Sequence, residues 1–109
     1  TGAWAEKARQ YQRQAQQRLA KHEFIIGKYY YKRKNYAAAL NRFQAMFAQF
    51  PPELCPPEAY LLTYQILQKM GRSEESLQYL RQVVQLFPGT EWSQEAATLL
   101  NSAGRNARP

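Results

Sequence analysis

The chain has no aspartate, one histidine and one cysteine among its 109 residues, and these shortages exclude several kinds of site. A single cysteine cannot form an intrachain disulfide. With so few ligating side chains, an ordinary zinc or calcium site cannot be assembled, so we expect neither a metal ion nor any other cofactor. No stretch approaches the roughly 20 consecutive apolar residues that a membrane-spanning helix requires.

The sequence also contains few residues that could act together in catalysis. The only histidine, His22, falls on an apolar helical stripe, where we expect a packed structural side chain rather than a general base. Glu74 and Glu75 are adjacent and diverge on a helix, whose first turn favours carboxylates. Cys55, among prolines, is expected to be a half-buried loop residue. The sequence therefore predicts a protein without catalytic activity.

Two stretches of the chain correspond when one is shifted by 37 residues. Small or aromatic side chains recur at matching positions, and a proline closes each stretch, which is typical of tetratricopeptide repeats. Each such unit is a helical hairpin that must stack on a neighbour to bury its apolar face. The matching positions are Ile26, Gly27, Tyr30, Ala39, Phe43 and Pro51 in the first stretch and Thr63, Tyr64, Leu67, Ser76, Leu80 and Pro88 in the second.

This pattern predicts an all-α fold, a right-handed α-solenoid of tetratricopeptide-like hairpins with about five helices. We expect residues 1–101 to form one domain with two repeats, a long N-terminal helix and a capping helix, and residues 102–109 to form a flexible tail. Ser73 and Thr90 are expected helix caps. The long helix carries an apolar stripe predicted to be its buried side, made of Trp4, Ala8, Tyr11, Ala15, Leu19, His22, Ile26 and Tyr30.

The net charge of +7 is unevenly spread. Residues 1–50 hold ten Lys or Arg against two Glu, giving +8, whereas residues 51–109 hold five against six, giving −1. A basic half attracts nucleic acid, anionic lipid or an acidic protein face, although the same charges also suit a solvated helix surface. Because residues 28–34 mix basic and aromatic side chains, a basic nucleic-acid-binding helical domain remains an alternative.

Stacked hairpins bind other proteins along a wall lined by the first helix of each unit. Phe24 is the most informative candidate on this wall, because it lies off the main stripe and has no evident core role. Contact with a neighbouring helix is the competing interpretation. An aromatic side chain beside cations would suit an extended acidic or C-terminal peptide. The wall-facing candidates are Lys21, Phe24, Lys28, Tyr31, Leu61, Gln65 and Gln68.

A more specific pattern runs from Leu19 to Arg33 and continues through Tyr36-Ala37-Ala38-Ala39 and Asn41-Arg42. With the Phe-Pro endings at residues 50–51 and 87–88, this pattern resembles the BamD family of outer-membrane lipoproteins. The resemblance covers residues 15–100. Two features depart from it: Lys34 replaces the glycine usual at the first hairpin turn, and the glutamine-rich residues 10–17 have no clear counterpart.

The resemblance implies a non-catalytic scaffold at the periplasmic face of the Gram-negative outer membrane, within the machinery that assembles β-barrel proteins. Its partners would be periplasmic domains of the barrel-forming subunit or companion lipoproteins, with no small-molecule substrate. Membrane attachment would come only from an N-terminal lipid anchor that these residues do not include. A tetratricopeptide adaptor of another envelope complex, of the Tol–Pal type, is the alternative. The exposed end of an incomplete stack could also support self-association.

Overall fold

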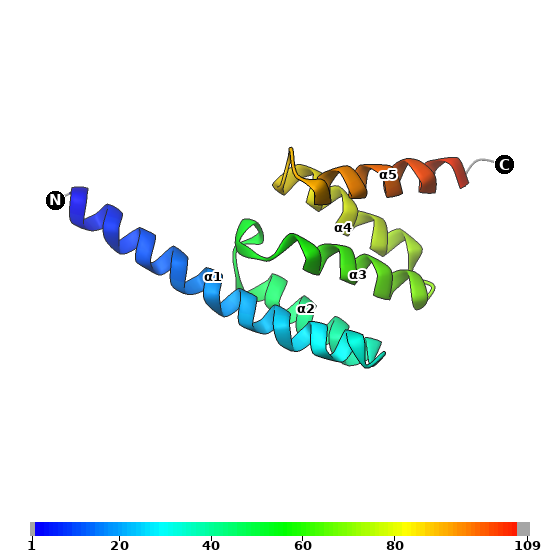
Figure 1. Ribbon diagram of the computed structural model, residues 1–109, viewed down its shortest axis with the longest axis horizontal. Coiled ribbons are helices and arrows are strands. Elements are labelled where there is room, and N and C mark those ends of the chain that lie inside the picture. Colours follow the sequence, from blue (N-terminus) through cyan, green and yellow to red (C-terminus); the bar gives the residue numbers. More distant parts are fainter. Residues whose placement is uncertain (1, 107–109) are drawn as a thin grey trace. The chain divides into compact units, whose positions relative to one another are not determined.

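The computed structural model describes residues 2–106, which contain five α-helices, one short 3₁₀ helix and no strand (Figure 1). The predicted all-α fold of helical hairpins is therefore confirmed for this part of the chain. The chain divides into two compact units, residues 1–55 and 56–109. The helices are α1 (Gly2–Lys32), α2 (Tyr36–Gln49), η1 (Pro52–Leu54), α3 (Pro57–Lys69), α4 (Ser73–Leu86) and α5 (Glu91–Asn106).

The first unit is a hairpin in which α2 packs against the C-terminal half of α1, while the N-terminal half of α1 extends beyond α2 (Figure 1). The two helices meet most closely at Gly27. A Cβ atom there would lie 2.4 Å from Cε1 of Phe43, so only glycine fits. Beside this contact, the rings of Phe24 and Phe43 stack with centroids 6.0 Å apart. Glycine at residue 27 therefore sets the helix separation that this aromatic core requires.

The proline-rich segment after α2 closes the first unit. The backbone turns extended at Phe50, since two prolines follow and disfavour further helix, and a single turn of 3₁₀ helix forms as η1. This turn packs against α1, with Leu54 buried and a partly exposed ion pair of 3.7 Å between Arg13 and Glu53. The segment thus supports the middle of α1.

The second unit is the hairpin of α3 and α4, with α5 packed against both helices. Pro57 occupies the first turn of α3, where its missing N–H group costs nothing. The ring of Tyr60 meets the ring of Phe87 edge-on at 5.8 Å. Thr90 caps α5 as expected, because its Oγ1 accepts a hydrogen bond of 3.2 Å from the Ser93 N–H. The most buried apolar side chains of this unit are Ala59, Tyr60, Ile66, Leu67, Leu80, Val83 and Ala96.

Both hairpins turn with the same backbone geometry, which repeats at the predicted shift of 37 residues. After α1, the Asn35 N–H donates to the Tyr30 carbonyl at 3.0 Å and the Lys34 N–H donates to the Tyr31 carbonyl at 2.9 Å. The same pair of bonds follows α3, where the N–H groups of Arg72 and Gly71 are the donors. These bonds define the Schellman motif, whose penultimate position is left-handed. Lys34 has φ of 63° and Gly71 has φ of 77° at that position.

The repeat also holds in the cores. Ala39 and Ser76 are corresponding small residues, and both are fully buried. Phe43 and Leu80 correspond and are fully buried as well. The 37-residue correspondence found in the sequence is therefore present in the packing of each unit.

The predicted buried stripe of α1 is wrong. Trp4 is 75% exposed, Tyr11 68% and Leu19 55%. The buried residues of α1 are instead Ala20, Phe24 and Gly27, which lie on another side of the helix. Periodicity identifies an apolar face, but α1 has two, and α2 covers the one with fewer apolar positions.

Two predicted boundaries also differ. Ser73 is the first residue of α4 rather than its cap. Arg72 occupies the cap position, and no side chain makes a capping hydrogen bond there. Helix α5 continues to Asn106, so residues 102–106 of the expected tail are helical, and residues 107–109 lie outside the described residues. Whether residues 1–101 act as one domain stays a prediction. No helix in residues 2–106 has the length and apolar character needed to cross a membrane.

Replacing Lys34 with glycine should stabilise the protein. A non-glycine residue in the left-handed region costs about 1–2 kcal/mol, and glycine removes most of that cost. We expect the midpoint of thermal unfolding to rise by several degrees in Lys34→Gly, measured by circular dichroism. The matched change at the corresponding turn, Gly71→Ala, should lower it, and a rise in that variant would contradict the interpretation.

Replacing Gly27 with alanine should destabilise the first unit although alanine favours helix. The added methyl group must displace the buried Phe43 ring, and overpacking costs roughly 1–3 kcal/mol. The gain in helix propensity is only about 1 kcal/mol. Urea unfolding should show a lower midpoint for Gly27→Ala and no loss for Gly104→Ala, where nothing lies within 4 Å of the new Cβ atom.

Candidate protein-binding site

The four candidates on α1 share one side of the helix, because their spacing of three, four and three residues follows the helical turn. Phe24 is buried, and its ring stacks on Phe43 of α2. The expectation that Phe24 has no core role is therefore wrong. The sequence could not reveal this, because Phe24 belongs to the less apolar face that α2 happens to cover. Loss of binding in a Phe24→Ala variant would not separate binding from folding.

The other three α1 candidates lie nearer the surface than Phe24. The Lys28 ammonium lies 5.7 Å from the centre of the Phe24 ring, a cation–π contact. Tyr31 is half-buried, and its ring meets Tyr36 edge-on at 5.8 Å. Burial and, secondarily, the neighbouring Tyr36 raise the pKa of the Tyr31 hydroxyl, which stays protonated and able to donate a hydrogen bond. Lys21 is exposed.

This part of α1 therefore presents two ammonium groups and a phenol hydroxyl above a buried aromatic core. Such groups can donate hydrogen bonds to carboxylates and carbonyl oxygens. Because α2 holds Phe24 and Tyr31 in place, their neighbours Lys28 and Lys21 project from a rigid base. The arrangement is suited to binding an acidic segment of a polypeptide rather than to carrying out a reaction.

The three candidates on α3 differ in what they offer. Leu61 is buried, so its side chain is not available at the surface. Gln65 is half-buried. Gln68 is exposed, and its Nε2 donates a hydrogen bond of 2.9 Å to Oγ of Ser76 on α4. Of these three candidates, the two glutamines are the ones that can present polar groups to a partner.

Gln68 also borders a hollow that the sequence did not predict. It has a volume of about 330 Å³ and lies among α3, α4 and α5 of the second unit. The position of α5 creates this hollow, and no spacing within a single helix indicates it. Its lining residues are Tyr64, Gln68, Ser73, Glu74, Leu77, Leu99, Ser102 and Ala103.

The residues that could support chemistry are dispersed. Among the described residues, no group of three or more His, Cys, Asp or Glu side chains could hold a metal ion. His22 is exposed, so the expectation of a packed histidine is wrong. Cys55 is fully buried rather than half-buried, and its Sγ lies 3.6 Å from the Pro51 carbonyl oxygen. Burial and, secondarily, Glu53 raise the pKa of the Cys55 thiol to about 11, which suppresses the reactive thiolate.

Comparison with known proteins gives a consistent assignment. A family model described as YfiO, outer membrane lipoprotein, matches residues 1–78. The chain is also 27% identical over 84 residues to the outer membrane protein assembly factor BamD of Rickettsia prowazekii (strain Madrid E). That match covers 77% of this chain and 34% of the relative, so the chain spans about a third of the length of this curated relative. Because the family model covers well over half of the chain, this helical-hairpin protein belongs to the YfiO family of outer membrane lipoproteins.

Proposed function

We propose that this chain is a non-catalytic protein-interaction scaffold of the machinery that assembles β-barrel proteins in the outer membrane. The observation that carries the proposal is the family match over residues 1–78, which includes the whole first unit and most of the α3–α4 hairpin. The curated relative is described as an outer membrane protein assembly factor. The partners would be periplasmic domains of the barrel-forming subunit or companion lipoproteins, met at the periplasmic face of the outer membrane.

The geometry of each unit supports a binding role. Helical hairpins with a tightly packed interior hold their outer side chains on a rigid frame, so a partner meets a preformed surface and loses less conformational freedom on binding. Exposed Lys21, and Lys28 above the Phe24 ring, provide positive charge on α1. In the second unit, Gln68 at the edge of the hollow provides an amide that can pair with a peptide backbone.

The non-catalytic part of the proposal rests on the environments of His22 and Cys55. His22 is exposed on α1, whereas Cys55 is buried behind η1 with a raised thiol pKa. A nucleophile and its base must lie within hydrogen-bonding reach of each other, whereas the Cys55 thiol donates to the backbone carbonyls of Met46 and Pro51 and not to His22. The proposed work of the chain is therefore to hold partners rather than to transform a substrate.

Capture by the immobilised 109-residue chain tests the proposal. Detergent-solubilised Gram-negative outer membranes would be passed over the chain at low and moderate salt, and bound proteins identified by mass spectrometry. We expect recovery of the barrel-forming subunit of the assembly machinery at both salt concentrations. Recovery only of nucleic acid or ribosomes, lost steeply with salt, would overturn the scaffold role and favour the nucleic-acid alternative.

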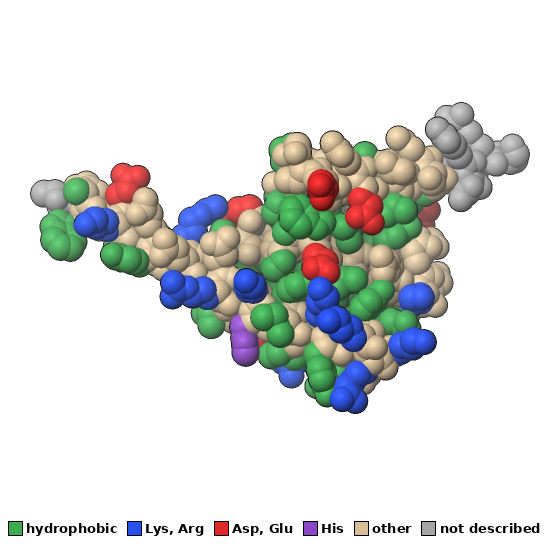
Figure 2. Space-filling model, in the orientation of Figure 1, with side chains coloured by type: hydrophobic (Ala, Val, Ile, Leu, Met, Phe, Trp, Pro, Cys, Tyr) green, Lys and Arg blue, Asp and Glu red, His purple; other side chains and the backbone are tan. Residues whose placement is uncertain are grey.

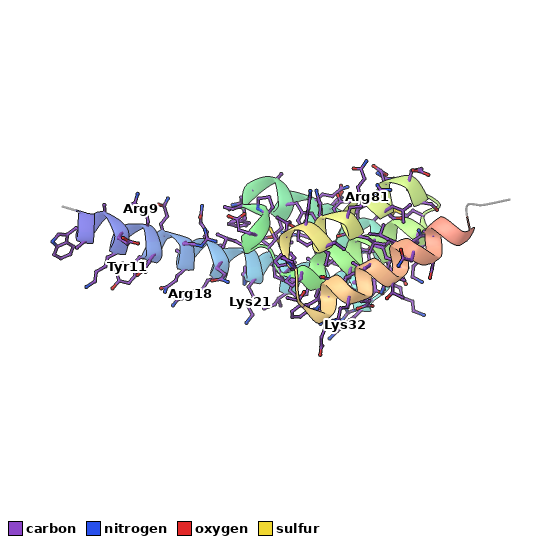
Figure 3. All side chains as sticks on the ribbon, turned by 90° about the horizontal axis from the view of Figure 1, so that it is seen from above. Arg9, Tyr11, Arg18, Lys21, Lys32 and Arg81 are labelled. Atoms are coloured by element: carbon purple, nitrogen blue, oxygen red, sulfur yellow. The ribbon has the colours of Figure 1, made fainter. Side chains whose placement is uncertain are left out.

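A pair of charge reversals locates the site. Lys21→Glu alters an exposed candidate on α1, and Arg81→Glu makes the same change at an exposed position of α4 outside the candidate set (Figure 3). We expect Lys21→Glu to reduce captured subunit about tenfold and Arg81→Glu to reduce it less than twofold, since a reversed charge repels the partner strongly only where it lies in the contact. Equal losses in both variants would show only a dependence on net charge and would reject Lys21 as a contact.

A further inference from the structure

One entire face of α1 is exposed and carries a heptad pattern of mostly apolar side chains, interrupted by Arg18 and His22. Its positions are separated alternately by four and three residues from residue 4 to residue 29. This spacing keeps the positions along one side of a helix and is the repeat of coiled coils. We name this face the heptad seam, and its eight members, all exposed or largely exposed, are Trp4, Ala8, Tyr11, Ala15, Arg18, His22, Ile25 and Tyr29.

The heptad seam lies opposite the face that packs on α2. At 3.6 residues per turn, Ala20, Phe24 and Gly27 are on the far side of the helix from the seam. Figure 3 shows the arrangement along the extended part of α1, where Tyr11 and Arg18 lie on one side and Arg9 on the other. Helix α1 therefore has two faces built to receive a helix, and the described chain covers only one.

Large apolar side chains are exposed near both ends of the heptad seam. Trp4 is 75% exposed, Ile25 55% and Tyr29 51%. Large exposed apolar side chains scattered singly are normal, whereas several on one face of a helix indicate an interaction site. In the space-filling view, hydrophobic side chains gather at the N-terminal end of α1, and basic side chains lie along the rest of its extended part (Figure 2).

The size of the side chains on the heptad seam fits another helix. In its first two heptads, bulky Trp4 and Tyr11 alternate with small Ala8 and Ala15. Helix α2 already packs on a small–aromatic–small series of α1, at Ala20, Phe24 and Gly27. A lipid surface would gain little from alanines, whereas a second helix can insert bulky side chains opposite them.

The charges beside the heptad seam indicate the chemistry of that helix. In coiled-coil register, the flanking positions on one edge hold Lys7, Gln14, Lys21 and Lys28, and the seam itself contains Arg18. No acidic residue occupies the seam or its flanks, because Glu6 and Glu23 fall at outer positions of the heptad. Among the described residues, no ion pair involves Lys7, Arg18 or Lys21. A second copy of the chain would bring like charges together.

We propose that the heptad seam of α1 binds an amphipathic α-helix of a partner protein, with bulky aliphatic residues along its apolar face and acidic residues beside them. The apolar residues of the partner pack over Ala8 and Ala15 between the aromatic side chains. Its carboxylates pair with the lysines of the flanking edge and with Arg18. This surface shares Lys21 and Lys28 with the candidate site on α1 and extends it along the exposed face toward Trp4.

A designed helical peptide tests this proposal without a known partner. The probe has four heptads with leucine at its apolar positions and glutamate at the flanking ones, and the comparison peptide carries lysine in place of glutamate. Binding to the intact chain would be followed by fluorescence anisotropy of labelled peptide. In a Trp92→Phe background, a blue shift of Trp4 emission would report burial of the heptad seam. We expect saturable binding of the glutamate peptide and at least tenfold weaker binding of the lysine peptide.

Two arginines on the same helix provide matched variants. Arg18→Glu reverses a charge on the heptad seam, and Arg9→Glu makes the same change on the other side of α1 (Figure 3). We expect Arg18→Glu to weaken binding of the glutamate peptide about tenfold and Arg9→Glu to weaken it less than twofold. Tyr11→Ala, which removes an exposed ring, should also weaken binding while leaving the circular dichroism spectrum unchanged.

Several outcomes would overturn the proposal. Equal binding of the two peptides, or equal effects of the two arginine variants, would remove the basis for an acidic helix. Binding only to vesicles of anionic phospholipid would assign the face to a membrane surface. A dimer in sedimentation equilibrium that Tyr11→Glu abolishes, with no peptide binding, would assign it to a second copy. Capture by the unsubstituted chain tests the scaffold role separately, because the barrel-forming subunit can be captured whether or not this peptide binds.

Discussion

The short distance between α1 and α2 determines how the core of the first unit packs. Gly27 allows the Phe43 ring to lie against the backbone of α1, where it also stacks with the ring of Phe24. Lys28 then lies over Phe24, so a charged surface group depends on a contact two layers below it. Any change in the helix separation would alter the core and the candidate binding surface together. The packing of this unit and its candidate binding surface are therefore coupled through the absent side chain of Gly27.

The second unit reaches the same hairpin geometry with different side chains. Its turn has glycine at the left-handed position where the first has lysine, and its small residue at the helix crossing is Ser76 rather than Ala39. The Ser76 hydroxyl donates to the Ser73 carbonyl at 2.6 Å and accepts from Gln68, so its buried position leaves no unmet hydrogen bond. Equivalent backbone shape thus places constraints on residue size, while the polar chemistry of each site is free to differ.

Much of this fold could be predicted from the sequence, and the exceptions share a physical cause. Prolines, Gly71 and the 37-residue shift depend on local backbone geometry, so they located the hairpins and their turns correctly. Which face of α1 is buried depends on where α2 lies, and this is not encoded within α1 itself. For that reason Phe24 and His22 were assigned to the wrong environments. The hollow bordered by Gln68 was missed because it exists only when α5 has packed. The binding roles of the seven candidate residues stay predictions.

The N-terminal half of α1 has a consequence for how tightly any ligand can be held there. Its backbone is helical, yet beyond the support at Arg13 and Glu53 it has little packed surface, and isolated helices of this length are marginal in water. Part of the free energy released by docking a helix on this segment would be consumed in ordering it. Binding would then be weaker than the contact area suggests, dissociation correspondingly quicker, and affinity open to adjustment by substitutions that alter helix propensity alone.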